Sequence, residues 1–211
     1  RVSPAHRRRT AGARPPVAAR SKASPAGLDG PQRLCLLRTV FVAADYEGTR
    51  LRMLAAEAVG DEVLDLGCAQ SMNAHLRRPG RRITGLDLAA PAGPVRYDRH
   101  LIGDVFDLER LDDGRAYDTI VMGEFIEHVE RPYDLLRLLR GHLDPAGRLV
   151  VSTPNPLAIP VAWFEWARSP RRFFTDDHAF YFPPRWVTRM LERTGYRVAA
   201  VKAVGLWPTA W

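Results

Sequence analysis

Short apolar runs that close on an acid or a glycine recur along the chain. Such runs occupy residues 62–67, 82–88, 100–105, 117–122, 148–153 and 196–204. The runs at 119–122 and 149–151 are apolar without alternation. That pattern is typical of strands buried on both faces of a parallel sheet.

Helical patterns separate these runs. They occupy residues 34–42, 46–59, 71–78, 132–143 and 184–194, and in the clearest of them Leu135, Leu138, Leu139 and His142 share one stripe. Strands that alternate with helices predict right-handed crossovers between parallel strands. We therefore expect an α/β fold with a Rossmann-like doubly wound sheet, whose ligand site lies at the carboxyl ends of the strands.

The composition agrees with one globular domain over residues 31–211. Hydrophobic residues make up 46% of the chain and charged residues 26%, which are ordinary values. No apolar run approaches the ~20 residues that a membrane span needs. The two cysteines, Cys35 and Cys68, form no disulfide framework, so we expect reduced thiols in a cytoplasmic protein.

The net charge of +7 comes from the N-terminal segment. Residues 1–33 hold eight Arg/Lys and one acid, whereas the remaining chain holds 23 of each sign. Residues 1–30 contain almost no large apolar side chain, so we expect a disordered basic tail, with an organellar transit peptide as the alternative. The balanced body argues against nucleic acid as a partner, because phosphate binding needs clustered positive charge.

A glycine loop follows the first run and indicates a nucleotide pocket. A dinucleotide fold needs G-x-G-x-x-G, and here the three positions hold Gly67, Ala69 and Met72. The bulky Met72 counts against a pyrophosphate cofactor. S-adenosylmethionine has no pyrophosphate and tolerates small residues beyond the first glycine. Asp87 ends the second run, where a carboxylate accepts hydrogen bonds from ribose hydroxyls.

The remaining candidates each have a structural alternative. Asp104 and Val105 follow the third run and are candidates for the adenine, although acids after strands are also common helix caps. Cys68 is read mainly as a small buried residue beside the glycine.

Several of these segments are similar to class I S-adenosylmethionine-dependent methyltransferases. The similarity rests on residues 63–71, 85–88, 104–105, 117–129 and 143–155, and residues 123–129 and 143–149 resemble the ubiquinone-pathway O-methyltransferases and their small-molecule relatives. The resemblance implies a seven-stranded sheet with an antiparallel last strand. Because the chain ends at Trp211, that strand is expected to be very short or the chain to be a fragment. The implied cofactor-binding residues are Asp65, Gly67, Cys68, Ala69, Asp87, Leu88, Asp104, Val105 and Glu124.

Methyl transfer to a hydroxyl needs an oriented acceptor and a base. The candidate catalytic residues are His128, after the fourth run, and His178 with its neighbour Asp177, and packing histidines are the alternative. We expect no metal. The alternative implied by the resemblance is a divalent ion held by Glu124, Glu127 and His128.

An aromatic insert at 157–183 completes the sequence picture. Nine of the chain's nineteen aromatic residues lie between 163 and 186. We expect a lid over the pocket that shapes a site for an apolar or aromatic small molecule. A homodimer contact, or membrane attachment through Arg168, Arg171 and Arg172, is the alternative. The rival functions are a methyltransferase-like binding module without catalysis and a methyltransferase acting on nucleic acid or protein.

Overall fold

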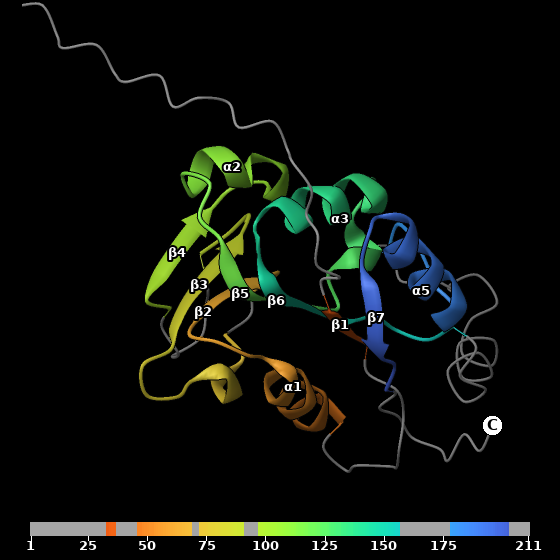
Figure 1. Cartoon of the computed structure of the whole chain (residues 1–211), viewed down its shortest axis with the longest axis horizontal. Helices are drawn as coiled ribbons and strands as arrows, with labels where there is room; N and C mark the ends of the chain where they lie inside the picture. The colour runs from red at the N-terminus through yellow and green to blue at the C-terminus, as the bar shows by residue number, and fades with distance from the viewer. Residues whose placement is uncertain (1–32, 37–45, 69–71, 91–96, 157–177, 203–211) are drawn as a thin grey trace, which may run out of the picture.

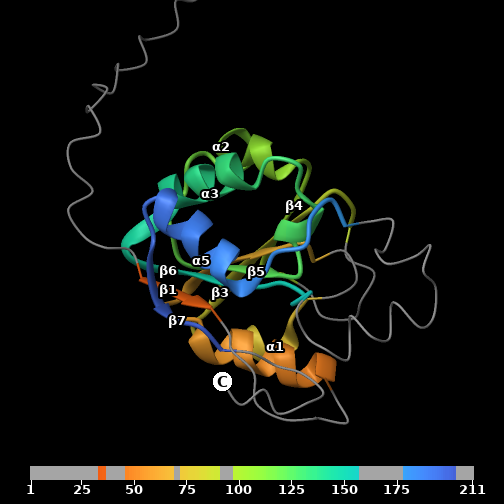
Figure 2. The same ribbon diagram turned by 90° about the vertical axis from the view of Figure 1, so that its right-hand side faces the viewer.

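The computed structural model describes residues 33–36, 46–68, 72–90, 97–156 and 178–202, which form three layers (Figures 1 and 2). A sheet lies in the middle. Helix α1 (Tyr46–Glu57) covers one face, and α2 (Leu108–Leu111), α3 (Pro132–Gly141) and α5 (Pro184–Arg193) cover the other. Among these residues, no helix combines the length and the apolar character that crossing a membrane requires.

The sheet confirms the predicted doubly wound architecture. Its seven strands are β1 (Arg33–Leu36), β2 (Glu62–Leu66), β3 (Arg82–Asp87), β4 (Arg99–Ile102), β5 (Tyr117–Gly123), β6 (Leu143–Ser152) and β7 (Arg197–Ala200). They are ordered β4-β3-β2-β5-β6-β1-β7, and every described pairing is parallel. The chain moves outward from β2 to β4 and then returns to β5 on the other side of β2. A ligand site is therefore expected at the carboxyl ends of β2 and β5.

The antiparallel last strand that the resemblance implies stays an expectation. The last described strand, β7, runs parallel to β1. Residues 203–211, where a further strand would follow, lie outside the described residues, as do the tail at 1–30 and residues 157–177 of the insert.

The helix predicted over 34–42 is wrong at its start, because residues 33–36 form β1 between β6 and β7. A short apolar run cannot be assigned to helix or strand by periodicity alone. Here the edge of β6 that does not pair with β5 pairs with residues 33–36, and Leu34 lies opposite Leu149.

Both faces of the central strands are buried, as their continuous apolar character predicts. On β5, Ile120 and Met122 pack on the side of α3 and α5, whereas Val121 packs on the side of α1. All three are at most 1% exposed.

The first crossover is shorter than predicted. In place of a helix over 71–78 there is one turn of 3-10 helix, η1 (Ala74–Leu76). Its cap is Asn73, whose side chain accepts a hydrogen bond from the His75 amide at 3.1 Å, and not Ser71. Leu76 is fully buried against α1, so one turn is enough to cover β2 and β3.

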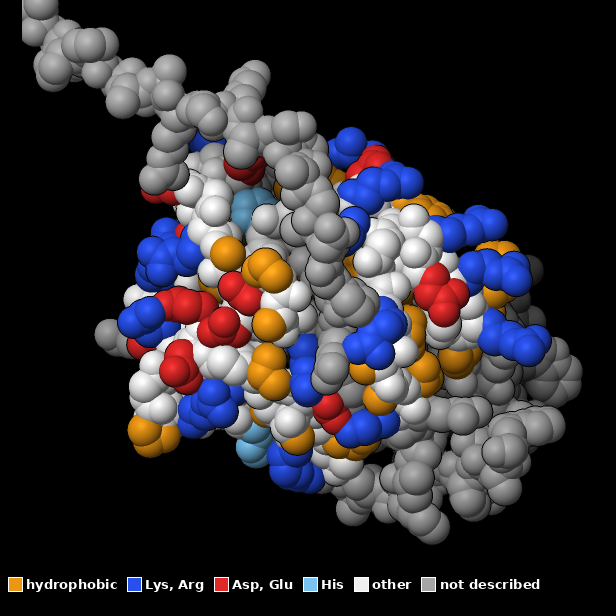
Figure 3. Space-filling model, in the orientation of Figure 1, with side chains coloured by type: hydrophobic (Ala, Val, Ile, Leu, Met, Phe, Trp, Pro, Cys, Tyr) orange, Lys and Arg blue, Asp and Glu red, His pale blue; other side chains and the backbone are white. Residues whose placement is uncertain are grey.

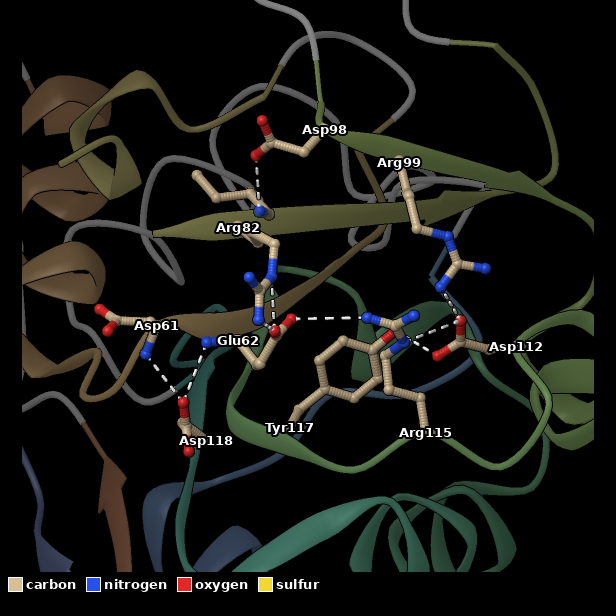
Figure 4. A network of polar contacts seen from close by, with 10 residues as sticks. Asp61, Glu62, Arg82, Asp98, Arg99, Asp112, Arg115, Tyr117 and Asp118 are labelled. Atoms are coloured by element: carbon tan, nitrogen blue, oxygen red, sulfur yellow. Dashed lines mark hydrogen bonds and ion pairs between the residues drawn. The ribbon is translucent and has the colours of Figure 1, made fainter. Parts of the chain in front are cut away.

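A charged network joins the amino ends of β2 to β5, at the edge opposite the expected site (Figure 4). Asp112 is 2% exposed and accepts hydrogen bonds from the Tyr117 hydroxyl and the Arg99 guanidinium. Asp118 accepts bonds from the amides of Asp61 and Glu62 at 2.7 and 2.9 Å. These carboxylates satisfy buried or strand-end donors, so they serve the fold.

Candidate functional site

Two adjoining cavities open at the carboxyl ends of β2, β3 and β5. The first has a volume of about 520 Å³ and the second of about 320 Å³. Asp87, Phe125 and His128 line both cavities. They therefore form one groove, with Asp87 where its two parts meet.

Gly67 ends β2 in a conformation that only glycine adopts easily. Its φ is +73°, and a Cβ at this position would lie 2.5 Å from Cδ2 of Phe125. The backbone thus lines the first cavity without a side chain. The predicted close approach of a ligand to this loop is compatible with the geometry.

Asp65 lies in β2, two residues before Gly67, and is 6% exposed. Burial raises the pKa of this carboxyl to about 6, although the Tyr97 hydroxyl, which donates a hydrogen bond to Oδ2 at 3.1 Å, opposes the shift. Cys68 is 3% exposed, and burial raises the pKa of its thiol to about 11. Its Sγ lies 3.7 Å from Nε2 of His100. A thiol in this environment is inert, which agrees with the structural interpretation of Cys68.

The second cavity contains the residues predicted for the ribose and the adenine. Asp87 is half-buried, and Leu88, Asp104 and Val105 line the cavity beside it. Asp104 also caps η2 (Val105–Asp107), because its Oδ1 accepts a bond from the Phe106 amide at 2.9 Å. The cap leaves Oδ2 for a ligand, so the two interpretations of Asp104 are compatible.

Sequence reasoning missed Arg50, which points from α1 into the first cavity. It is 7% exposed and donates to the Ser152 hydroxyl at 3.2 Å. Its Nε lies 3.4 Å from Oε1 of Glu124. The signal in the sequence is its spacing, four residues before Leu54 and eight before Ala58, which places a cation on the buried stripe of this helix.

Glu124 reaches this position through an unusual backbone. Its φ is +53°, in the left-handed region that non-glycine residues rarely adopt, and its amide donates to the Ser152 carbonyl at 3.0 Å. Such conformations cluster at functional sites because the surrounding structure must hold them in place.

Two histidines from distant parts of the chain meet at the edge of the first cavity. His128 ends η3 (Ile126–His128), and His178 lies in the last, described part of the insert, residues 178–183. Their rings pack edge to face with centroids 4.7 Å apart, and Tyr181 packs on His178 at 5.1 Å. The Phe180 amide donates to the Glu127 carbonyl at 3.0 Å and attaches this part of the insert to η3.

Comparison with known protein families shows the family to which the chain belongs. Residues 38–201 match a family described as a methyltransferase domain. The chain belongs to the class I S-adenosylmethionine-dependent methyltransferases. The resemblance seen in the sequence is thereby confirmed.

Curated relatives of this methyltransferase include two proteins named ubiquinone biosynthesis O-methyltransferase. The one from Xanthomonas euvesicatoria is 32% identical over 146 residues, which cover 64% of this chain and 58% of the relative. The one from Aeromonas salmonicida is 25% identical over 162 residues, covering 71% of this chain and 68% of the relative. The chain thus spans little more than half the length of the first of them.

Solved structures share the fold at low sequence identity. A SAM-dependent methyltransferase from Archaeoglobus fulgidus superposes with a TM-score of 0.56 and 20% identity, covering 74% of this chain and 70% of that one. The plantazolicin methyltransferase BpumL, in complex with SAH, superposes with a TM-score of 0.55 and 14% identity, covering 70% and 62%.

The metal ligands implied by the resemblance fit only in part. Among the described residues, one group of metal-ligating side chains has its ligand atoms within 4.8 Å of one another, and it consists of Glu127, His128 and His178. Glu124 is not in this group and pairs with Arg50.

The roles of all the predicted site residues stay predictions, and the positions of two of them are not described. Ala69 and Asp177 lie outside the described residues, so the methyltransferase structure places neither.

Proposed function

We propose that this chain transfers the methyl group of S-adenosylmethionine to a hydroxyl oxygen of a small apolar or aromatic molecule. The cofactor would lie along the groove with its amino-acid end in the first cavity and its adenosine in the second. Arg50 would bind the carboxylate, and Asp65 and Glu124 would lie near the ammonium. Asp87 would accept bonds from the ribose hydroxyls, and Asp104 and Val105 would contact the adenine.

The pairing of His128 and His178 at the edge of the first cavity is the observation that carries the proposal. The acceptor oxygen attacks the methyl carbon, and the carbon–sulfur bond breaks with its electron pair moving to sulfur, which leaves as a neutral thioether. The hydroxyl proton moves to a ring nitrogen of His128 or His178. Well-oriented proximity can supply about 7–11 kcal/mol of such a barrier.

The choice of acceptor has two supports. Curated relatives are named as O-methyltransferases, although at 25–32% identity over part of their length. The described end of the insert brings one aromatic ring beside the site, since Tyr181 packs on His178, which lines the first cavity. Aromatic side chains favour flat apolar ligands.

Calorimetric titration with S-adenosylhomocysteine tests the cofactor, and absence of binding would sink the enzyme proposal. Labelled S-adenosylmethionine, offered with cell extract and with a panel of phenols, catechols and aliphatic alcohols, tests the acceptor. We expect label in low-mass hydroxylated compounds. Label in nucleic acid or protein would contradict the proposed acceptor.

Separate His128→Ala and His178→Ala variants test the proton-handling centre. Loss of a general base costs roughly 10²–10⁴-fold in turnover. We expect such a loss while the affinity for S-adenosylhomocysteine stays within about twofold. His75→Ala, at an exposed histidine of η1, is the matched control. A variant that turns over like the wild type removes its histidine from the mechanism.

A further inference from the structure

Three side chains that could ligate a metal converge beside the first cavity. Glu127 and His128 are neighbours in η3, and His178 enters from the described part of the insert, residues 178–183. Every pair of their ligand atoms lies within 4.8 Å. The hydrogen bond from the Phe180 amide to the Glu127 carbonyl holds the two segments together, so the convergence is part of the fold.

Glu127 is the side chain that points to a ligand. It is 1% exposed, and neither carboxylate oxygen has a hydrogen-bond partner in the part of the chain that the structure describes. The Thr153 hydroxyl lies near the carboxylate but makes no hydrogen bond of good geometry with it. A buried carboxylate without hydrogen bonds is costly unless a positive charge compensates it. A cation held jointly with the two imidazoles would provide that compensation.

The third ligand in this group is His178, and not Glu124 as the resemblance implied. Glu124 is held by its left-handed backbone and by the ion pair of its Oε1 with Arg50 at 3.4 Å. His178 takes its place beside Glu127 and His128. The donor set therefore changes from two carboxylates and one imidazole to one carboxylate and two imidazoles.

We propose that Glu127, His128 and His178 bind one divalent transition-metal ion, with Zn²⁺ preferred over Mg²⁺. Imidazole nitrogens favour zinc and other late transition metals, whereas magnesium favours oxygen ligands. Three protein ligands leave a coordination position open, as in catalytic zinc sites. His128 is exposed and His178 lines the first cavity, so an ion can reach the site and an acceptor oxygen can approach it.

The consequence for chemistry rests on the proposed function, whereas the metal site does not. With both imidazoles held as ligands, a divalent ion would take over the role given to them above: it would lower the pKa of an acceptor hydroxyl in contact with it, and the proton would pass to solvent water. The chain's own contribution is to hold the three ligands, through η3 and the bond between Phe180 and Glu127, at the edge of the cofactor groove.

Cobalt titration of the chelator-treated full chain tests the site directly. We expect one equivalent of Co²⁺ to bind with the visible absorption of a nitrogen-ligated ion, Zn²⁺ to displace it, and Mg²⁺ in large excess to leave the spectrum unchanged. His178→Ala, His128→Ala and Glu127→Gln should each weaken binding by more than the roughly 10–100-fold that loss of an outer-shell partner costs.

Two control variants make the result decisive. His75→Ala removes an exposed histidine of η1, and Glu124→Gln removes the carboxylate of the alternative set. Both should bind Co²⁺ as the wild type does. The proposal is overturned if the wild type binds no Co²⁺, or if Glu124→Gln abolishes binding while His178→Ala does not.

Circular dichroism and the affinity for S-adenosylhomocysteine verify that each variant is folded. Should His178→Ala unfold, the isosteric His178→Asn repeats the measurement. Cobalt binding without methyl transfer leaves the metal site standing and counts against the proposed function. Methyl transfer that survives exhaustive chelation, in a protein that binds no Co²⁺, supports the proposed function and overturns the metal site.

Discussion

Residues 46–130 and residues 131–211 divide the charge of this methyltransferase between them. The first region holds 10 Arg/Lys and 16 Asp/Glu, and the second holds 12 and 6. The balance of the body, which the sequence totals show, is therefore a sum of an acidic and a basic region. In Figure 3, acidic and basic side chains intermingle on the left, whereas basic ones gather over α3 and α5.

This difference in charge agrees with the role that we propose for each region. The acidic region contributes β2 to β5 and the acids around the groove, where a cofactor with a sulfonium and an ammonium would lie. The basic region contributes His178 and two of the helices on the opposite face of the sheet from α1, namely α3 and α5. Each prediction below perturbs one region and asks whether the other responds.

The largest effect is expected at the glycine that opens the cofactor groove. In Gly67→Ala, the new Cβ meets Phe125 and the φ of +73° becomes strained. Overpacking and left-handed backbone together cost about 2–5 kcal/mol if the loop keeps its shape. The loop relieves this strain by moving, and ligand binding must then restore the shape of the groove, so affinity for S-adenosylhomocysteine should fall at least about 30-fold by calorimetry.

Gly80→Ala is the matched control, because φ is +82° but no atom lies within 4 Å of the added Cβ. It should lose some stability and keep its affinity. Wild-type affinity in Gly67→Ala would instead place the cofactor elsewhere.

A pH effect on stability is expected from Asp65. Burial raises the pKa of this carboxyl from 3.8 to about 6, so the folded state holds its proton more tightly than the unfolded state. The resulting stabilisation is complete below the unfolded pKa and is lost as pH rises through about 6. It amounts to roughly 3 kcal/mol.

Urea denaturation of the wild type and of Asp65→Asn, at about pH 4 and pH 7, isolates this contribution. The variant should lose about 2–2.5 kcal/mol less of its unfolding free energy over the same rise in pH, because at pH 4 the unfolded carboxyl is already partly ionised. An identical pH dependence in both proteins would mean that Asp65 is not the buried acid that the structure shows.

Arg50→Gln tests the proposed contact between Arg50 and the cofactor, which the sequence did not reveal. A hydrogen bond to a charged group contributes about 1.5–3 kcal/mol, so affinity for S-adenosylhomocysteine should fall roughly 10–100-fold. Arg52→Gln, two residues along the same helix and exposed, should leave it unchanged. Equal losses in the two variants would assign the effect to helix α1 as a whole.

The smallest effect is expected from the basic region. Arg185 and Arg189 are exposed on α5. Surface substitutions away from special features stay within about 0.5 kcal/mol, and salt screens exposed charges beyond a Debye length of about 8–10 Å. The double variant Arg185→Gln/Arg189→Gln should therefore bind S-adenosylhomocysteine within about twofold of the wild type. A tenfold change would show that the two regions are electrostatically coupled.

Much of the fold could be predicted because burial is periodic along the chain. The five central parallel strands lie within a few residues of the runs seen in the sequence, with Gly67 and Asp87 at their ends. Predictions failed where two structures satisfy the same apolar pattern. Residues 33–36 form a strand rather than a helix because their backbone pairs with β6 on one side and with β7 on the other.

The sequence by itself determined the parallel strands, the glycine loop and the acid that ends the second strand, because local periodicity and turn chemistry encode these features. Only the tertiary structure decided which side chains share the site. It brought His178 against His128, fifty residues apart, turned Glu124 toward Arg50, and left the Glu127 carboxylate buried beside the two imidazoles. Such convergence depends on how distant segments pack, and no local pattern carries that information.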